Sequence, residues 1–262
     1  MQIRSPRIVI YDIETVPNLP EALKVWPQLS NYPGQTFKAS INSIACFGWK
    51  ILGEETTNIV SAWDFPEWTH DVNNDEPILR RILEIFDGAD GVITQNGKAF
   101  DEKFIQTRLL LNEMDIMPKY AHLDTKLLAK KFSFFSNSLK YLTEQLTDTR
   151  KLDNSGWDLW CRVHARDHVA CAEMATYCKG DVDALEAVYR RLRVASTGAN
   201  KLPNHNLFLI NGSRSVCPHC GSTRSVKFGL RYNNTRSYQR YRCNDCRAYF
   251  VSDASDKNPR AV

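Results

Sequence analysis

The sequence predicts an α/β fold in which helices flank a sheet, followed by a small separate module. Strand-like segments come first, and segments with apolar residues at helical spacing then alternate with two more strands before helix dominates. Two Cys-x-x-Cys pairs stand near the end of the chain. A layered sheet with helices on its faces is the simplest architecture for this order. With 262 residues, the chain can bury one such core and still supply a small module.

The expected elements follow from hydrophobic periodicity and from turn residues. Strands are expected at residues 7–11, 41–51, 56–63, 91–94 and 119–123. The turn at Gly53-Glu54 would pair the second strand with the third, giving a three-stranded antiparallel start. Helices are expected at residues 78–86, 100–111, 125–132, 138–146 and 167–193.

A linker is expected at residues 196–206, a segment that contains Gly, Pro and three Asn. This places one domain at 1–205 and a second at 206–262. The charge is distributed unevenly between them, because residues 212–262 contain ten Lys or Arg against three Asp or Glu. Such asymmetry indicates a polyanionic partner, although basic tails are also often merely solvated.

Composition argues against a membrane or secreted protein. No stretch approaches the roughly 18 consecutive apolar residues of a membrane-spanning helix. The first residues, Met-Gln-Ile-Arg-Ser-Pro-Arg, lead straight into a strand-like segment instead of an apolar signal region. Four of the eight cysteines form the two tight pairs and the others are scattered, a pattern that favours a reducing compartment and a metal. We therefore expect a soluble, cytoplasmic protein.

An acidic pair closes the first expected strand. Asp12 and Glu14 are two residues apart, so the pleat of a strand points both side chains to the same face. Two adjacent carboxylates repel each other unless a cation lies between them, and a divalent metal is the usual compensation. A solvated strand end is the alternative interpretation of this pair alone.

Two further acidic motifs follow in the chain. Asp101 ends the segment Asn96-Gly-Lys-Ala-Phe-Asp101, at an expected junction between strand and helix. Tyr177 and Asp181 are four residues apart in the last long helix, and this spacing places the phenol and the carboxylate on one face. Taken singly, these residues could equally be a helix N-cap, a packed tyrosine and a surface charge.

Together the three motifs resemble the DEDD exonuclease family, whose motifs are Asp-x-Glu, an Asn followed shortly by an aromatic residue and Asp, and Tyr-x-x-x-Asp. The resemblance covers about residues 7–194. Within the family, the chain is most similar to the stand-alone relatives of family B polymerase proofreading domains. The stretches His122 to Thr125 and Ser138 to Leu142 also resemble that group. Because Tyr177 stands four residues before Asp181, the tyrosine type is implied. The resemblance implies a ribonuclease H-like mixed five-stranded sheet flanked by helices.

The resemblance also implies the activity, which is removal of nucleotides from the 3′ end of nucleic acid, chiefly single-stranded DNA, with release of nucleoside 5′-monophosphates. Asp12 would bridge two Mg²⁺ or Mn²⁺ ions, Glu14 and Asp181 would complete the ion on the nucleophile side, and Asp101 would hold the second ion. Tyr177 would orient the attacking water. The resemblance also implies that Asn96 and Phe100 contact the substrate, although Phe100 could equally belong to the core.

The same resemblance suggests a small nuclease of DNA replication or repair, with a DNA polymerase or other replication protein as a possible partner. If a phage encodes it, the protein would act in the host cytoplasm. The alternative from another class is a non-catalytic protein that keeps the nuclease fold and binds nucleic acid or assists a polymerase.

The two Cys-x-x-Cys pairs predict a structural zinc site. Pairs separated by 22 residues suit two knuckles that each offer two thiolates to a tetrahedral Zn²⁺; the expected ligands are Cys217, Cys220, Cys243 and Cys246. Redox-active pairs are disfavoured, because no thioredoxin-like pattern surrounds them. Basic residues interleaved with aromatics suit phosphate contact and base stacking, and the expected contacts are Arg231, Tyr232, Arg240 and Arg242. Protein docking by this β zinc ribbon is the alternative.

One more basic and aromatic stretch leaves two interpretations open. The residues concerned are Lys126, Lys130, Lys131, Phe132, Phe134 and Phe135. They could hold and stack a single strand of nucleic acid. Core aromatics beside a solvated basic face are favoured over that interpretation.

Overall fold

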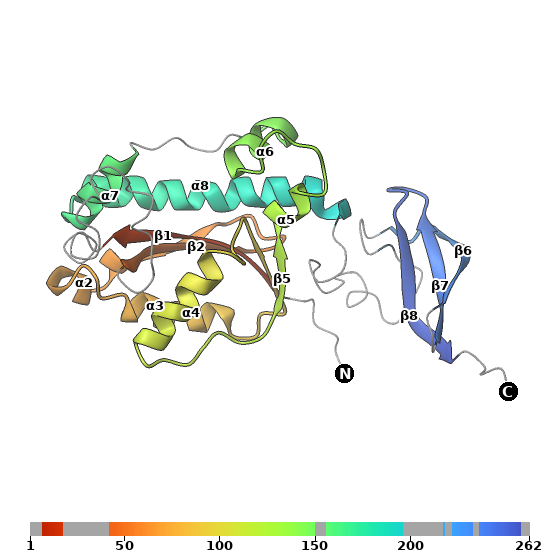
Figure 1. Cartoon of the computed structure of the whole chain (residues 1–262), viewed down its shortest axis with the longest axis horizontal. Coiled ribbons are helices and arrows are strands. Elements are labelled where there is room, and N and C mark those ends of the chain that lie inside the picture. The colour runs from red at the N-terminus through yellow and green to blue at the C-terminus, as the bar shows by residue number, and fades with distance from the viewer. Residues whose placement is uncertain are drawn as a thin grey trace. The chain divides into compact units, whose positions relative to one another are not determined.

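The chain divides into two compact units, Arg7–Lys201 and a C-terminal unit that begins at Leu202. The structure, a computed structural model, describes residues 7–17, 42–149, 156–195, 217, 222–232 and 236–257. The expected linker at 196–206 and the expected boundary at 205 lie outside these residues. Each unit is described below by itself (Figure 1).

The first unit contains a five-stranded sheet with the order β3-β2-β1-β4-β5. Its strands are β1 (Ile8–Pro17), β2 (Asn42–Ile51), β3 (Asn58–Ser61), β4 (Gly91–Thr94) and β5 (Ala121–Asp124). The first three pair antiparallel, whereas β1 with β4 and β4 with β5 pair parallel. The expected antiparallel start and the mixed five-stranded sheet are therefore confirmed.

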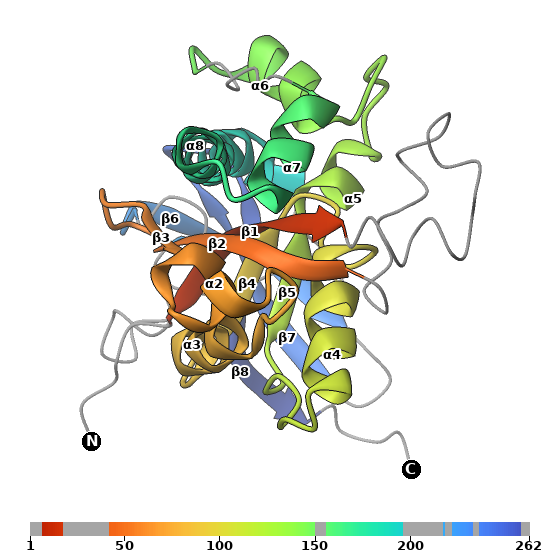
Figure 2. The ribbon, with the colours of Figure 1, turned by 90° about the vertical axis from the view of Figure 1, so that its left-hand side faces the viewer.

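Helices cover both faces of this sheet, with α7 and α8 on one face and α3 and α4 on the other (Figure 2). The helical elements are η3 (Ala62–Asp64), α2 (Glu67–His70), α3 (Glu76–Phe86), α4 (Asp101–Leu111), α5 (Thr125–Ala129), α6 (Leu139–Leu146), α7 (Trp157–His164), α8 (His168–Leu192) and η4 (Arg193–Ala195). Among the residues that the structure describes, none of these helices combines the length and apolar character needed to span a bilayer.

The two faces of strand β1 differ in character. One face packs into a hydrophobic cluster, and the other, which we call the acidic face, carries Asp12 and Glu14. Val9, Tyr11 and Ile13 are buried in one hydrophobic cluster with side chains of α3 and α4. Because side chains alternate along a strand, Asp12 and Glu14 point to the opposite face. The expectation that the strand ends at Tyr11 is wrong, since pairing with β2 continues to Pro17, with an irregular register between Glu14 and Thr15.

Most expected helices are present, with differences at their ends. Asp124 caps α5 by accepting the backbone N–H groups of Lys126 at 3.0 Å and Leu127 at 3.4 Å. This helix ends at Ala129, so its expected continuation to Phe132 is wrong. Helices α2 and α7 were not expected; in α7, Leu159 and Val163 share one face and are fully buried.

The second unit contains a three-stranded antiparallel sheet of order β6-β7-β8. Its strands are β6 (Ser225–Tyr232), β7 (Arg236–Cys243) and β8 (Tyr249–Lys257). On this sheet the guanidinium of Arg240 lies 5.7 Å from the ring centre of Phe228 and 5.6 Å from that of Tyr249. The arrangement is a small β module with a cation stacked against two aromatic rings.

Candidate active site

Three carboxylates converge on the face of the sheet that α8 covers. One oxygen each of Asp12, Glu14 and Asp181 lies within 4.8 Å of the others. Asp181 is buried and the two strand carboxylates are half-buried. Burial of negative charges at such short range is costly without a cation. The arrangement therefore has the character of a cation site.

A close approach of α8 to the sheet brings Asp181 to the strand residues. Asp12 is paired with Gly48 on β2. A Cβ atom at position 48 would lie 3.0 Å from Sγ of Cys178 and 3.1 Å from its carbonyl oxygen. Sγ of Cys178 is in turn 3.6 Å from the carbonyl oxygen of Asp12. Gly48 and the small side chain of Cys178 thus set the distance between helix and strand, a role that no sequence motif indicates for either residue.

Asp101 lies beside this group without being part of it. It is the first residue of α4 and is 3% exposed. Its Oδ1 accepts the backbone N–H of Ile13, between Asp12 and Glu14, at 3.3 Å. Burial raises the pKa of Asp101 from 3.8 to about 7, and the nearby charge of Asp124 adds to the rise.

The raised pKa predicts how pH affects the metal-free protein. Because the folded state keeps a proton on Asp101 between pH 3.8 and about pH 7, the free energy of unfolding falls as pH rises through this window. Asp101→Asn should remove this pH dependence of the free energy of unfolding. Its size is about 1.4 kcal/mol for each unit by which the pKa of Asp101 in the folded state exceeds that in the unfolded state. Thermal unfolding in EDTA from pH 4 to 8 measures it, with Asp87→Asn, at an exposed position, as control. Equal pH dependence in wild type and Asp101→Asn would contradict the prediction.

Two hydrogen-bonded groups fix the segment that carries Asp101. Asn96 has a left-handed backbone with φ 68°, which Asn tolerates better than most residues, and its N–H donates to Oδ1 of Asp124 at 3.0 Å. Glu102 contacts Nδ1 of His122 at 2.6 Å, and Nε2 of His122 lies 2.8 Å from Oγ1 of Thr94. His122 therefore supports the start of α4.

Tyr177 and Phe100 stand near Asp181 and Asp101 in the chain and have different surroundings. Tyr177 is half-buried on α8, one turn before Asp181. Phe100 is half-buried, packs against the hydrophobic cluster behind β1 and lies 5.7 Å from the ring of Phe104. The ring of Phe100 therefore contributes to the core, and its contact with substrate stays a prediction.

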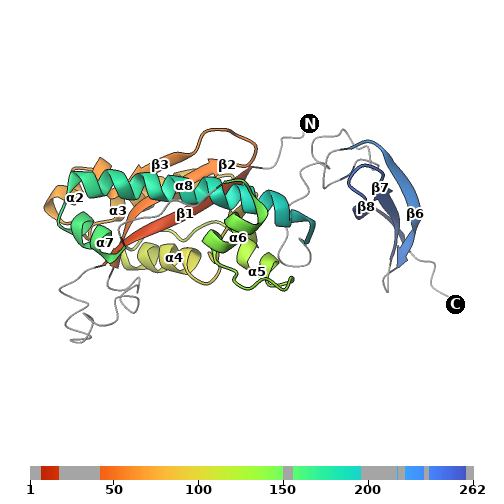
Figure 3. The same cartoon turned by 90° about the horizontal axis from the view of Figure 1, so that it is seen from above.

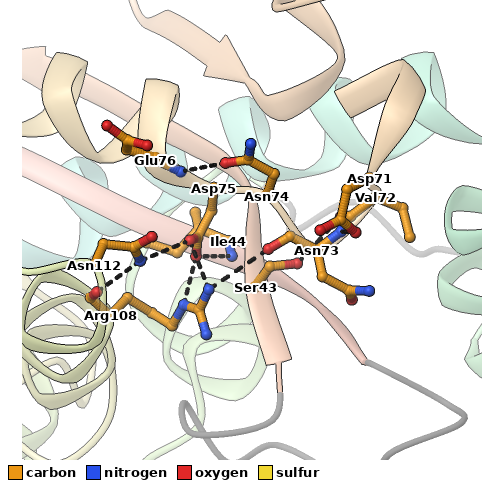
Figure 4. Close-up of polar contacts among 10 residues, drawn as sticks. All are labelled: Ser43, Ile44, Asp71, Val72, Asn73, Asn74, Asp75, Glu76, Arg108 and Asn112. Carbon is orange, nitrogen blue, oxygen red and sulfur yellow. Dashed lines mark hydrogen bonds and ion pairs between the residues drawn. The ribbon is translucent and has the colours of Figure 1, made fainter. Parts of the chain in front are cut away.

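A buried ion pair ties α4 to the beginning of β2 (Figure 4). The side chain of Asp75 is 0% exposed and accepts Nε and Nη2 of Arg108, each at 2.8 Å. Oδ2 of Asp75 also accepts the backbone N–H of Ile44 at 3.0 Å. Ile44 is the register partner of Thr15, the residue after Glu14. The pair therefore connects the helix that begins with Asp101 to the strand that pairs with the acidic strand.

The chemistry of the donors indicates which metals fit. Asp12, Glu14 and Asp181 offer oxygen ligands only, which suits Mg²⁺ or Mn²⁺ better than Zn²⁺. In the second unit, one sulfur each of Cys217, Cys243 and Cys246 lies within 4.8 Å of the others. Sγ of Cys217 and Sγ of Cys246 are 3.5 Å apart, near the separation of about 3.8 Å expected for two thiolates on a tetrahedral Zn²⁺.

The backbone around the cysteines repeats one pattern. The N–H of Cys217 donates to the carbonyl of Ser222 at 2.8 Å, and the N–H of Cys243 donates to that of Ala248 at 3.0 Å. Each bond joins a cysteine N–H to the carbonyl of the residue five positions later. The fourth expected ligand, Cys220, lies outside the described residues, as do the side chains of Arg231 and Tyr232, whereas Arg242 is half-buried on β7.

Comparison with protein families assigns the first unit. The model of the RNase H superfamily matches residues 36–193, more than half of the chain. The chain belongs to the RNase H superfamily. The match includes Asp101, Tyr177 and Asp181 and begins after the strand that carries Asp12 and Glu14. A search of curated proteins found no match to the sequence.

Solved structures agree with this fold. The chain is similar to a family B DNA polymerase from the hyperthermophilic archaeon Pyrobaculum calidifontis, with a TM-score of 0.55 and 12% sequence identity. The similarity covers 88% of this chain and 32% of the polymerase chain. At this identity it shows a shared fold, and the chain spans about a third of the polymerase's length.

Proposed function

We propose that the protein is a metal-dependent 3′–5′ exonuclease of the tyrosine DEDD type that acts on single-stranded DNA and releases nucleoside 5′-monophosphates. The observation that carries the proposal is the convergence of Asp12, Glu14 and Asp181 within 4.8 Å on the acidic face of an RNase H fold. Oxygen-only donors beside a half-buried tyrosine suit phosphodiester hydrolysis, in which position and charge do most of the work.

Each residue has a distinct task in this proposal. Asp12, Glu14 and Asp181 would hold one Mg²⁺ or Mn²⁺, and Asp12 and Asp101 would hold a second. Two such ions supply an activated water and neutralise charge on the phosphate. The hydroxyl of Tyr177 orients the water. Asn96, which has a left-handed backbone, and the half-exposed ring of Phe100 would contact the last nucleotide.

Digestion of 5′-labelled oligonucleotides tests the proposal. Single-stranded DNA and RNA of one sequence are incubated with Mg²⁺, Mn²⁺ or EDTA, and a third substrate carries a blocked 3′ end. We expect a metal-dependent ladder that shortens from the 3′ end of DNA, with nucleoside 5′-monophosphates as products. Internal cleavage of the blocked substrate would contradict the exonuclease, and the absence of any cleavage would favour a protein that only binds nucleic acid.

We propose that the second unit is a zinc ribbon that binds nucleic acid. Cys217, Cys220, Cys243 and Cys246 would hold one Zn²⁺, and the sulfur cluster and the repeated backbone hydrogen bonds support this ligand set. A unit this small buries little apolar surface, so the metal would supply much of its folding free energy. Arg231, Tyr232, Arg240 and Arg242 would contact the nucleic acid.

Substitution of one cysteine tests the zinc site. Cys243→Ser is expected to lose the bound zinc, because a serine hydroxyl replaces a buried thiolate ligand. Elemental analysis of the purified full chain measures the zinc content, with Cys161→Ser on α7 as the matched control. A Cys243→Ser variant that keeps the zinc content of wild type would exclude this ligand set.

A further inference from the structure

Two phenylalanines between α5 and α6 are unusually exposed. Phe135 is 94% exposed and Phe132 is 45% exposed, so the expectation that they are core aromatics is wrong. Neighbouring rings support both, since Phe135 lies 6.2 Å from Tyr141 and Phe132 lies 5.7 Å from Phe134. Exposed rings supported by other rings form a platform on which a further flat group can stack.

The charged residues within the segment that carries these rings have one sign. Residues 125–143 contain four Lys and no Asp or Glu. Lys130 and Lys131 are exposed immediately before Phe132, and Lys140 is exposed on α6. Exposed aromatics interleaved with lysines complement a partner that offers both flat rings and negative charge, which is the chemistry of a nucleic-acid strand with unpaired bases.

Hydrogen bonds fix this segment to Gln95, the residue that follows β4. We call residues 130–138 the aromatic loop; it joins α5 to α6, which lie next to α8 (Figures 1 and 3). Gln95 Nε2 donates to the carbonyl of Asn137 at 2.8 Å, and Gln95 Oε1 accepts from Oγ1 of Thr125 at 2.5 Å. Gln95 directly precedes Asn96, in the segment that leads to Asp101.

We propose that the aromatic loop binds the unpaired nucleotides that precede the 3′ terminus, with bases stacked on Phe132 and Phe135 and phosphates near Lys130. This inference rests on the proposed exonuclease activity and narrows its substrate. Two exposed rings can stack only unpaired bases, so the loop selects a single strand over a duplex end.

Binding of a fluorescent oligonucleotide to the full chain, measured by anisotropy in EDTA, tests the proposal without cleavage. Phe135→Ala is expected to raise the Kd for single-stranded DNA about tenfold, within the range for loss of one stacked base. Phe135→Trp keeps a ring and should bind like wild type. The matched control is Leu110→Ala on α4, an apolar side chain that is 70% exposed elsewhere on the first unit. Lys130→Ala should make binding less sensitive to salt. A plot of the logarithm of the DNA-binding constant against the logarithm of salt concentration should have a slope that is shallower by about 0.7.

Photocross-linking with 5-iodouracil DNA locates the contact independently of any binding by the second unit. We expect cross-links at Phe132 or Phe135. An unchanged Kd for Phe135→Ala, together with the absence of cross-links at residues 130–138, would overturn the proposal and favour a protein partner for this surface. If the loop binds DNA but Mg²⁺ gives no cleavage, the proposed activity fails and the loop inference stands. If DNA is cleaved while the Kd of Phe135→Ala is unchanged and residues 130–138 give no cross-link, the activity stands and the loop inference fails.

Discussion

Replacing Asp12 with Asn is expected to lower the rate of hydrolysis at the 3′ end about a thousandfold. The change keeps the size of the side chain and removes one negative charge from the group formed with Glu14 and Asp181. Loss of a single group that stabilises transition-state charge costs about a hundredfold to a thousandfold. Asp12 is proposed to hold both metal ions, so its loss belongs at the upper end of this range.

Single-turnover digestion of 5′-labelled DNA at saturating Mg²⁺ measures this effect. Asp87→Asn, at an exposed position at the end of α3, is the matched control and should keep full activity. Asp181→Asn should lose about as much as Asp12→Asn, and the double variant should lose little more, because groups that act together are not additive. A rate for Asp12→Asn within about threefold of wild type would contradict the assigned site.

The position of the acidic pair could be predicted because it depends on local geometry. Side chains alternate along any strand, so Asp12 and Glu14 share a face whichever strands surround them. The spacing of Tyr177 and Asp181 is local in the same way. The end of the strand was predicted wrongly, because the sequence around the pair does not reveal that α8 covers this face and that pairing with β2 continues to Pro17.

Contacts between distant residues could not be predicted from the same patterns. Gly48 and Cys178 lie far apart in the chain, and no residue near either of them in the sequence indicates that they come into contact. Their close approach places Asp181 beside Asp12. The exposure of Phe132 was also missed, because apolar spacing over 125–132 predicts a buried helix face and α5 ends at Ala129 before it reaches this residue.

The second large effect concerns the buried ion pair that joins α4 to β2. Asp75→Ala is expected to lower the free energy of unfolding by about 3–5 kcal/mol, because it leaves the charge of Arg108 without its buried partner. The side chain of Arg108 is 14% exposed, and the variant also leaves the N–H of Ile44 without its acceptor. Since Ile44 pairs with Thr15 beside Glu14, activity should fall as well.

Urea unfolding followed by tryptophan fluorescence measures this loss in the first unit, because all six Trp precede residue 205. Arg80→Ala removes an exposed ion pair with Glu76 on α3 and should cost only about 0.3–0.5 kcal/mol. Replacing both Asp75 and Arg108 with Leu leaves no buried charge, so the double variant should be more stable than Asp75→Ala. A double variant as unstable as Asp75→Ala would show that lost packing, and not the unpaired charge, causes the effect.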